Sequence, residues 1–197
     1  MAMALLATVQ SAAVQLPALD AMWEPPNHSV ALPRRAWLGG DSDWSIPLGN
    51  GSSIWLFGDT LVGAWDAPLN QRVAEGFAMP HGTLARVDAD AKTGEVQATK
   101  FWNTSAREAV PTAWFVPNPA SVPGGADDFL WTTAGVAMPG GGPPGLAIVC
   151  PRVRTSTAPG PFAFQVVRTT VIHVQDASGH PRDWQYTTCD LPGTGSD

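Results

Sequence analysis

The sequence contains few charged residues, and this shortage limits the folds that it can adopt. Only 14% of its 197 residues are Asp, Glu, Lys or Arg, against about a quarter in an average protein. Long amphipathic helices need a charged face, and the chain has only four Glu and two Lys. Charge-driven disorder is equally disfavoured, because hydrophobic residues make up 44% of the chain. The composition therefore favours an all-β globular protein.

Other shortages exclude classes of function. The net charge is −6 and basic stretches are short, as at Arg34-Arg35 and Arg152-Val153-Arg154, so binding to nucleic-acid phosphates is not expected. No apolar run approaches the about 18 to 20 residues that a membrane helix needs. The four His show no metal-ligand spacing, so the sequence predicts neither a zinc site nor any other cofactor.

The cysteine count leaves two interpretations open. Cys150 and Cys189 could form one disulfide in an oxidising compartment or remain as two buried thiols. Residues 1–16 are apolar but lack the positive charge that begins a good signal peptide. Together with the glycosylation sequons, they lead us to expect a secreted glycoprotein. The sequons begin at Asn27, Asn50 and Asn103.

Glycine, proline and tryptophan are abundant, with 20, 19 and 9 residues. From about residue 36, short apolar runs alternate with turn-forming residues, and Asn50-Gly51 predicts a hairpin turn. Continuous apolar runs are typical of strands in sheets that are buried on both faces. The predicted strands are 53–57, 83–87, 96–102, 129–133, 145–149 and 162–175, the last being a bent strand or a hairpin.

A faint internal repeat suggests how these strands are grouped. Ser45-Ile46-Pro47 with Ile54-Trp55 recurs, at the same internal spacing, as Ser121-Val122-Pro123 with Leu130-Trp131. One repeat could hold a four-stranded sheet, and radially repeated sheets of this kind are propeller blades. Coincidence in a Gly-, Pro- and Trp-rich chain is the alternative. A closed ring needs at least about four blades, so we expect a truncated part of a larger protein, with Trp55 and Trp131 between blades.

The segment from Trp37 to Gly63 carries a more specific pattern. It contains Gly-Gly-Asp at 39–41, a nearby Ser, a Gly turn and Trp-Leu-Phe-Gly-Asp-Thr at 55–60. This segment resembles the opening blade of uncharacterised five-bladed β-propellers related to arabinanases, xylosidases and invertases. Residues 171–191 resemble a later part of the same family.

The resemblance covers about residues 36–192 and implies an incomplete five-bladed β-propeller. Residues 1–35 would form a leader, residues 36–192 the partial propeller domain and residues 193–197 a tail. The domain would hold about two to three blades, each a four-stranded antiparallel meander.

The resemblance also implies a chemistry. Glycosidases of this type hydrolyse glycosidic bonds in an axial funnel, with carboxylates on the inner strands. Asp41 matches the first-blade carboxylate, a general base or nucleophile. Asn118 stands at the comparable place of the second repeat and could bind a sugar hydroxyl but not titrate. Hydrolysis usually needs two carboxyl groups, about 5–5.5 Å apart for retention or 6.5–9.5 Å for inversion. No Glu matches the second one, so enzymatic activity of this chain is left open.

Four residues near these motifs are further candidates for substrate binding. Asp43 would share one side of an extended segment with Asp41 and could contact a sugar or a structural calcium ion. Trp44 could stack on a sugar ring. Asp59 could face a sugar or cap a turn. His81 could orient a sugar, act in acid–base chemistry or lie in a surface loop.

Three hypotheses follow from the sequence. The first is a carbohydrate-active protein of the propeller glycosidase type, monomeric when complete. The second is a propeller that binds carbohydrate or another partner without catalysis. The third is an unrelated β-sandwich binding module, which would show a Greek-key strand order.

Overall fold

The computed structural model describes residues 23, 32–49, 51–69, 71–74, 77–105, 110–118, 128–140, 142–155 and 163–193. The described residues are almost entirely strands and connecting turns, with one short 3-10 helix, η3 (Pro181–Asp183). The strands are β1 (Leu32–Gly40), β2 (Trp44–Pro47), β3 (Ser52–Asp66), β4 (Gln71–Arg72), β5 (His81–Ala89), β6 (Val96–Phe101), β7 (Asn103–Thr104), β8 (Pro111–Thr112), β9 (Asp128–Leu130), β10 (Ala134–Met138), β11 (Gly145–Thr155), β12 (Phe164–Val174) and β13 (Tyr186–Asp190).

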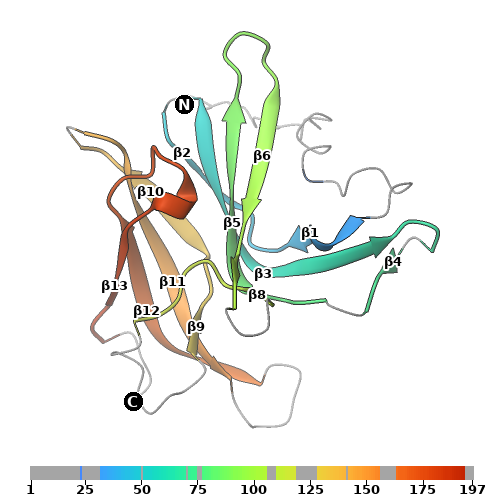
Figure 1. Ribbon diagram of the computed structural model, residues 1–197. Helices are drawn as coiled ribbons and strands as arrows, with labels where there is room; N and C mark the ends of the chain where they lie inside the picture. The colour runs from blue at the N-terminus through green and yellow to red at the C-terminus, as the bar shows by residue number, and fades with distance from the viewer. Residues whose placement is uncertain are drawn as a thin grey trace, which may run out of the picture.

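Most strands belong to two antiparallel sheets that lie side by side (Figure 1). The first sheet has the order β2-β3-β5-β6, and the second has the order β10-β11-β12-β13. In both sheets, successive major strands along the chain are neighbours, which is the order of a meander and not of a Greek key. The chain therefore forms two adjacent blades of an incomplete β-propeller, and the expected all-β fold is confirmed.

β3 links the first sheet to a smaller lateral sheet. This strand has 15 residues. Its first half pairs with β2 and β5, whereas its second half pairs with β1 and β4. Figure 1 shows the second half of β3 turning away from the first sheet together with β1 and β4. β1 and β2 therefore follow the same edge of β3, one after the other, and the loop that joins them lies at the bend.

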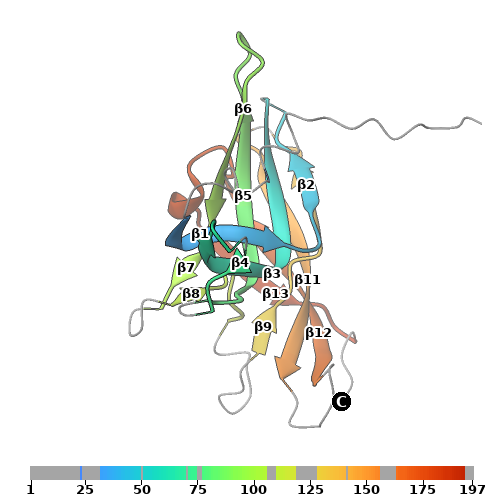
Figure 2. The same cartoon turned by 90° about the vertical axis from the view of Figure 1, so that its right-hand side faces the viewer.

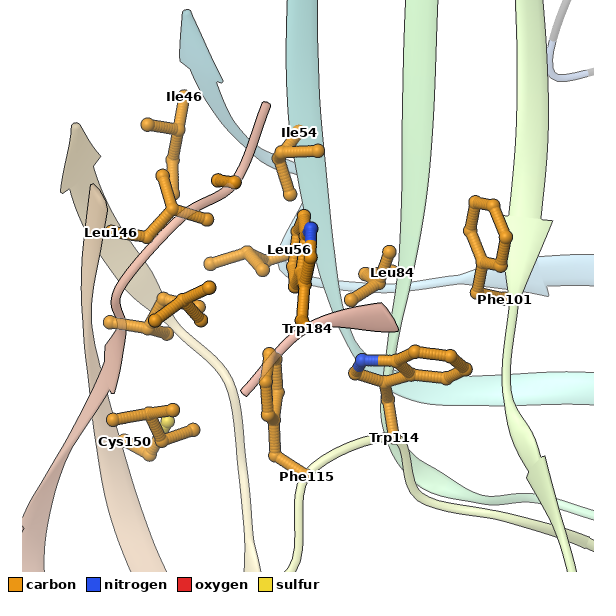
Figure 3. Close-up of a cluster of buried hydrophobic side chains, with 14 of the residues drawn as sticks. Ile46, Ile54, Leu56, Leu84, Phe101, Trp114, Phe115, Leu146, Cys150 and Trp184 are labelled. Carbon is orange, nitrogen blue, oxygen red and sulfur yellow. The ribbon is translucent and has the colours of Figure 1, made fainter. Parts of the chain in front are cut away.

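The hydrophobic core lies between the two sheets (Figure 3). Ile54, Leu56 and Leu84 of the first sheet and Leu146 and Ile148 of the second are completely buried. Burial of one such side chain contributes about 1.5–3 kcal/mol relative to exposure. The two sheets share this core and therefore stabilise one another.

Trp55 does not lie in this core, contrary to expectation. Side chains alternate along a strand, so the inward positions of Ile54 and Leu56 direct Trp55 to the opposite face of the first sheet. There Trp55 Nε1 donates a hydrogen bond to Ser53 Oγ at 3.1 Å. Trp131 is also outside the cluster of buried residues, and its ring meets the ring of Phe164 edge-on at 5.6 Å. It does lie between the two sheets, because its Nε1 is next to Gly58 of β3.

The blades do recur along the chain, but not with the expected period. β2 begins at Trp44 and β10 at Ala134, which is a longer spacing than that from Ser45 to Ser121 in the sequence repeat. The sequence match had aligned Leu130-Trp131 with β3, whereas Leu130 ends β9, a short strand that pairs with the far half of β11. The sequence match therefore reflects similar composition. What the two blades share is the order of their strands.

The predicted strands are otherwise present, with different lengths. The run 162–175 is one strand, β12, and β3 continues past the expected stop at Gly58. β1 begins at Leu32, before the expected start of the domain at residue 36. β2 and β3 form the expected hairpin, although Asn50 in its turn lies outside the described residues. The β5–β6 hairpin projects from one end of the molecule (Figure 2).

The two cysteines do not form a disulfide. Cys150 is buried in the core, and Cys189 is exposed on β13. Cys189 lies opposite Val171, whereas Cys150 lies opposite Thr170 on the other side of β12. The two thiols therefore face opposite sides of the second sheet. Burial raises the pKa of the Cys150 thiol to about 12, so this group stays protonated.

Candidate functional site

Three of the residues singled out in the sequence lie in one row across the bend of β3. The Asp41 N–H donates a hydrogen bond to the Asp59 carbonyl at 3.1 Å, and the Gly58 N–H donates to the Asp41 carbonyl at 2.9 Å. On the other side of β3, Asp59 lies directly opposite His81. The antiparallel register therefore places Asp41, Asp59 and His81 on neighbouring segments, although the three residues are far apart in the sequence.

The loop that carries Asp41 has an unusual backbone. Ser42 and Asp43 have φ angles of 72° and 29°, both in the left-handed region that non-glycine residues rarely adopt. Strained conformations of this kind cluster at functional sites, where the surrounding structure holds them. Partial burial raises the pKa of Asp43, a backbone hydrogen bond lowers it, and the charge of Asp41 raises it to a smaller extent.

Asp59 and His81 form an ion-pair geometry within the row. His81 Nδ1 lies 2.7 Å from Asp59 Oδ1, and the two side chains are 36% and 30% exposed. Because an ionised carboxylate only accepts hydrogen bonds, the imidazole donates its hydrogen from Nδ1. The second ring nitrogen, Nε2, takes no part in this contact. Beneath this pair, Thr60 Oγ1 and Thr83 Oγ1 are joined by a buried hydrogen bond of 2.8 Å. The hydroxyl pair ties β3 to β5 at the position of the site.

The segment that enters the second sheet forms one wall of the site. Phe129 of β9 stacks on the His81 ring at a centroid distance of 3.8 Å and an interplanar angle of 19°. Thr132 Oγ1 donates a hydrogen bond of 2.6 Å to the Phe57 carbonyl. Gly58 has no room for a side chain, because a Cβ there would meet both Asp41 Oδ1 and Trp131 Nε1. The site therefore lies where the two blades meet.

Aromatic side chains flank the acidic loop. Trp44 is 45% exposed, while its Nε1 donates to the Gly135 carbonyl of β10 at 2.8 Å. On the other side, Asp43 borders a cavity of about 250 Å³, which also has Trp23, Trp37, Trp55 and Phe57 in its lining. Aromatic faces next to a carboxylate match the apolar face and the hydroxyls of a sugar ring.

Lys100 adds a positive charge to this aromatic cluster. Its Nζ lies 5.3 Å from the centre of the Trp23 ring and 5.5 Å from that of Trp37. Burial lowers the pKa of the Lys100 ammonium group. Cation–π contacts of this type contribute about 0.5–2 kcal/mol.

Asn118 lies elsewhere in the structure. It borders a different cavity next to Tyr186 of β13, and β13 is at the opposite edge of the second sheet from β10. β10 is the strand that contacts β2 of the first blade. The segment that precedes β10, as Asp41 precedes β2, is 131–133. Asn118 is therefore not at the position that the sequence repeat assigned to it.

A calcium site is not seen among the residues that the structure describes, where no group of three or more His, Cys, Asp or Glu side chains could hold a metal ion. Glu95 is exposed in the turn between β5 and β6. The other three glutamates, Glu24, Glu75 and Glu108, lie outside the described residues.

Within the described ranges there is also no helix with the length and hydrophobicity to cross a membrane.

A second group of charges is buried near the site. The Asp128 carboxylate accepts hydrogen bonds from Arg152 Nε at 2.8 Å and from Arg154 Nε at 2.7 Å. Arg152 also donates to Asp190 Oδ2 at 3.0 Å, and Thr170 Oγ1 donates to Asp190 Oδ1 at 2.6 Å. Asp128 directly precedes Phe129, so this network fixes the strand whose phenylalanine stacks on His81.

The sequence did not indicate Phe129, Trp131 or Gly58 as parts of the site. In the sequence, Phe129 and Trp131 look like part of an ordinary apolar strand. Only the pairing of β9 with the far half of β11 brings Phe129 to His81 and Trp131 to Asp41. Gly58 belongs to the Phe-Gly-Asp-Thr motif, but the reason for its small size is a contact with two distant segments. Long-range contacts of this kind leave no local pattern.

Comparison with known proteins gives a similarity to a solved structure. No family model matches the chain, and no curated protein matches it. The fold is similar to the crystal structure of a "putative hydrolase" from Bacteroides ovatus, with a TM-score of 0.55 and 15% identity. The similarity covers 85% of this chain and 40% of that one, so the chain spans less than half the length of its structural neighbour. At this identity, the similarity concerns the fold.

Proposed function

We propose that this protein is a carbohydrate-active hydrolase whose substrate binds across the row formed by Asp41, Asp59 and His81. The observation that carries the proposal is the backbone pairing of Asp41 with Asp59 beside the 2.7 Å contact between Asp59 and His81. This arrangement places a carboxylate and an oriented imidazole, two kinds of group that acid–base hydrolysis uses, on adjacent segments. The hydrolase description of the structural neighbour agrees with this reaction class.

The residues around the row fit a sugar substrate. Asp41 would act as general base or nucleophile, while Asp43 and the exposed face of Trp44 would bind hydroxyls and the ring face of the sugar. The aromatic cavity beside Asp43 would hold a neighbouring sugar unit. Asn118, at the far edge of the second sheet, is not included in this site.

A secreted location belongs to the same proposal, because polymeric carbohydrates are met outside the cell. Residues 1–16 and the sequon asparagines Asn27 and Asn50 lie outside the described residues. The sequon at Asn103 does not support glycosylation at that residue. Asn103 Nδ2 donates hydrogen bonds to the carbonyls of Ala113 and Trp114 at 3.2 and 2.9 Å. A glycan attached to this nitrogen would replace one of its two hydrogens and would therefore break at least one of these bonds.

The test is to incubate the protein with arabinan, xylan and inulin, and to measure both binding by calorimetry and the release of reducing sugar. We expect hydrolysis of at least one polymer, with a loss of about 100-fold or more in Asp41→Asn. Asp183→Asn, which changes an exposed carboxylate in η3, is the matched control.

Two other results would lead to different conclusions. Binding without release of sugar, in both the natural protein and Asp41→Asn, would favour a carbohydrate-binding propeller without catalysis. The absence of both binding and hydrolysis would overturn the proposal.

A further inference from the structure

We infer that His81 is the residue that transfers a proton to the leaving group, a role for which the sequence analysis found no matching glutamate. This inference rests on the proposed function. In the step, His81 Nε2–H gives its proton to the glycosidic oxygen as the bond from that oxygen to the anomeric carbon breaks. Asp41 takes a proton from the attacking water, whose oxygen forms the new bond to carbon. Solvent then returns the proton from Asp41 to His81, so that the cycle is balanced.

The contact with Asp59 prepares the imidazole for this role. With Nδ1–H held by the carboxylate at 2.7 Å, the neutral ring has its lone pair on Nε2, where it can gain and release a proton. The same division of tasks, with one nitrogen oriented by a carboxylate and the other active, is found in Ser-His-Asp triads. Asp59 therefore acts as a positioning residue for His81.

Two further contacts prevent the ring from turning. Phe129 covers one face of the imidazole at 3.8 Å. The next residue along β5, Gly82, has φ of 90°, and a Cβ there would lie 3.0 Å from the Leu130 carbonyl of β9. Close packing at Gly82 thus keeps β9 against the start of β5, where His81 lies. β9 is fixed in turn by Asp128, whose side chain is fully buried between Arg152 and Arg154.

No described glutamate can take this role. Glu95 follows β5 at the end opposite to His81, and a strand rises about 3.3 Å per residue. The nine residues of β5 therefore place Glu95 on the order of 25 Å from His81. Of the other two described histidines, His173 lies in β12 and His180 lies in the turn before η3.

The first test needs no substrate. Nitrogen-15 NMR of the imidazoles reports which ring nitrogen is protonated in neutral His81. We expect the Nδ1–H form in the natural protein and a loss of this preference in Asp59→Asn. A neutral His81 in the Nε2–H form would overturn the inference, whatever the protein binds.

The second test uses leaving groups that differ in their need for a proton. The probes are the 4-nitrophenyl and the methyl glycosides of arabinofuranose and xylopyranose, because nitrophenolate leaves without protonation and methoxide does not. We expect His81→Asn to lose about 100- to 10,000-fold in rate on the methyl glycoside and much less on the nitrophenyl glycoside. His173→Asn, an exposed histidine on β12, should match the natural protein on both.

The outcomes separate the two proposals. Equal losses on both glycosides of the sugar that the natural protein cleaves would overturn the role of His81 alone, because a residue that only orients the sugar affects both alike. If the natural protein cleaves none of the four glycosides and no polymer, the proposed function fails, and the transfer step fails with it. Circular dichroism of His81→Asn and Asp59→Asn shows whether each variant is folded.

Discussion

In the first sheet, the carboxylates beside β2 and β3 are partly or largely exposed, whereas in the second sheet the Asp128 carboxylate is buried and paired with arginine. Asp41 and Asp43 lie in a loop with two left-handed residues. The equivalent segment before β10, residues 131–133, contains Trp and two Thr and no charge. The strand order is the same in both sheets, but the positions that hold exposed carboxylates in the first hold uncharged residues in the second.

This difference shows how a repeated architecture can divide its tasks. Exposed carboxylates can exchange protons with a substrate, but they contribute little to stability. Buried, paired carboxylates cannot reach a substrate, but they hold several strands in one arrangement. The Asp128 network joins β9, β11, β12 and β13 through Arg152, Asp190 and Thr170, and β9 then supports His81 of the first sheet.

The largest effect is expected from breaking the buried network. Arg152 is 1% exposed and contacts two carboxylates, so Arg152→Met leaves Asp128 and Asp190 without this cation. Removal of one partner from a buried ion pair costs about 3–5 kcal/mol, and we expect a loss of this size in urea unfolding. Arg168→Met, an exposed arginine opposite Arg152 on β12, should change the free energy by well under about 1 kcal/mol. Similar small losses in both variants would contradict a stabilising role of the network.

The same network predicts how stability depends on acid. Hydrogen bonds from Arg154 and Arg152 hold the pKa of Asp128 below its ordinary value of 3.8. The native state therefore binds this proton less readily than the unfolded chain, and stability falls as the pH drops from 3.8 through the native pKa. We expect the urea midpoint of the natural protein to fall between about pH 5 and pH 2, and Asp128→Asn to have a flatter profile in that range. Parallel profiles would show that other carboxylates cause the acid sensitivity.

The sequence predicted the fold class and singled out three residues that the structure brings together in the candidate site, for a physical reason. Asp41, Asp59 and His81 each lie in or next to a local motif, and short apolar runs between Gly and Pro indicate strands. The register that places the three residues in one row depends on pairing between distant segments. Asn118 lies away from Asp41, and the blades recur at a longer spacing than the sequence repeat, for the same reason. Similar residue types in two segments do not make those segments equivalent strands. Phe129 enters the site only through the pairing of β9 with β11.

A moderate effect is expected at Gly58, where the two sheets meet. A Cβ on this residue would overlap Asp41 Oδ1 and Trp131 Nε1, and overpacking costs about 1–3 kcal/mol. We expect Gly58→Ala to lose stability in urea and also to lose sugar binding, because Asp41 must move. Gly142→Ala is the control, since a Cβ at Gly142 meets no atom within 4 Å. Loss of stability with unchanged binding would show that Asp41 can move without harm to the site.

The smallest effect on stability separates the two kinds of carboxylate most clearly. Burial and the nearby charge of Asp41 raise the pKa of Asp43, so the unfolded chain releases this proton first and the folded state loses stability as the pH rises through the native pKa. We expect Asp43→Asn to be slightly more stable than the natural protein at neutral pH, because asparagine also tolerates a left-handed backbone and carries no charge. The Asp43 carboxylate is only partly shielded from water, so the shift of the urea midpoint will be small, and Asp183→Asn should show none. The same variant should bind sugar less well. A residue whose removal stabilises the fold but weakens binding is retained for function, whereas a loss of stability in Asp43→Asn would place Asp43 with Asp128 as a structural carboxylate.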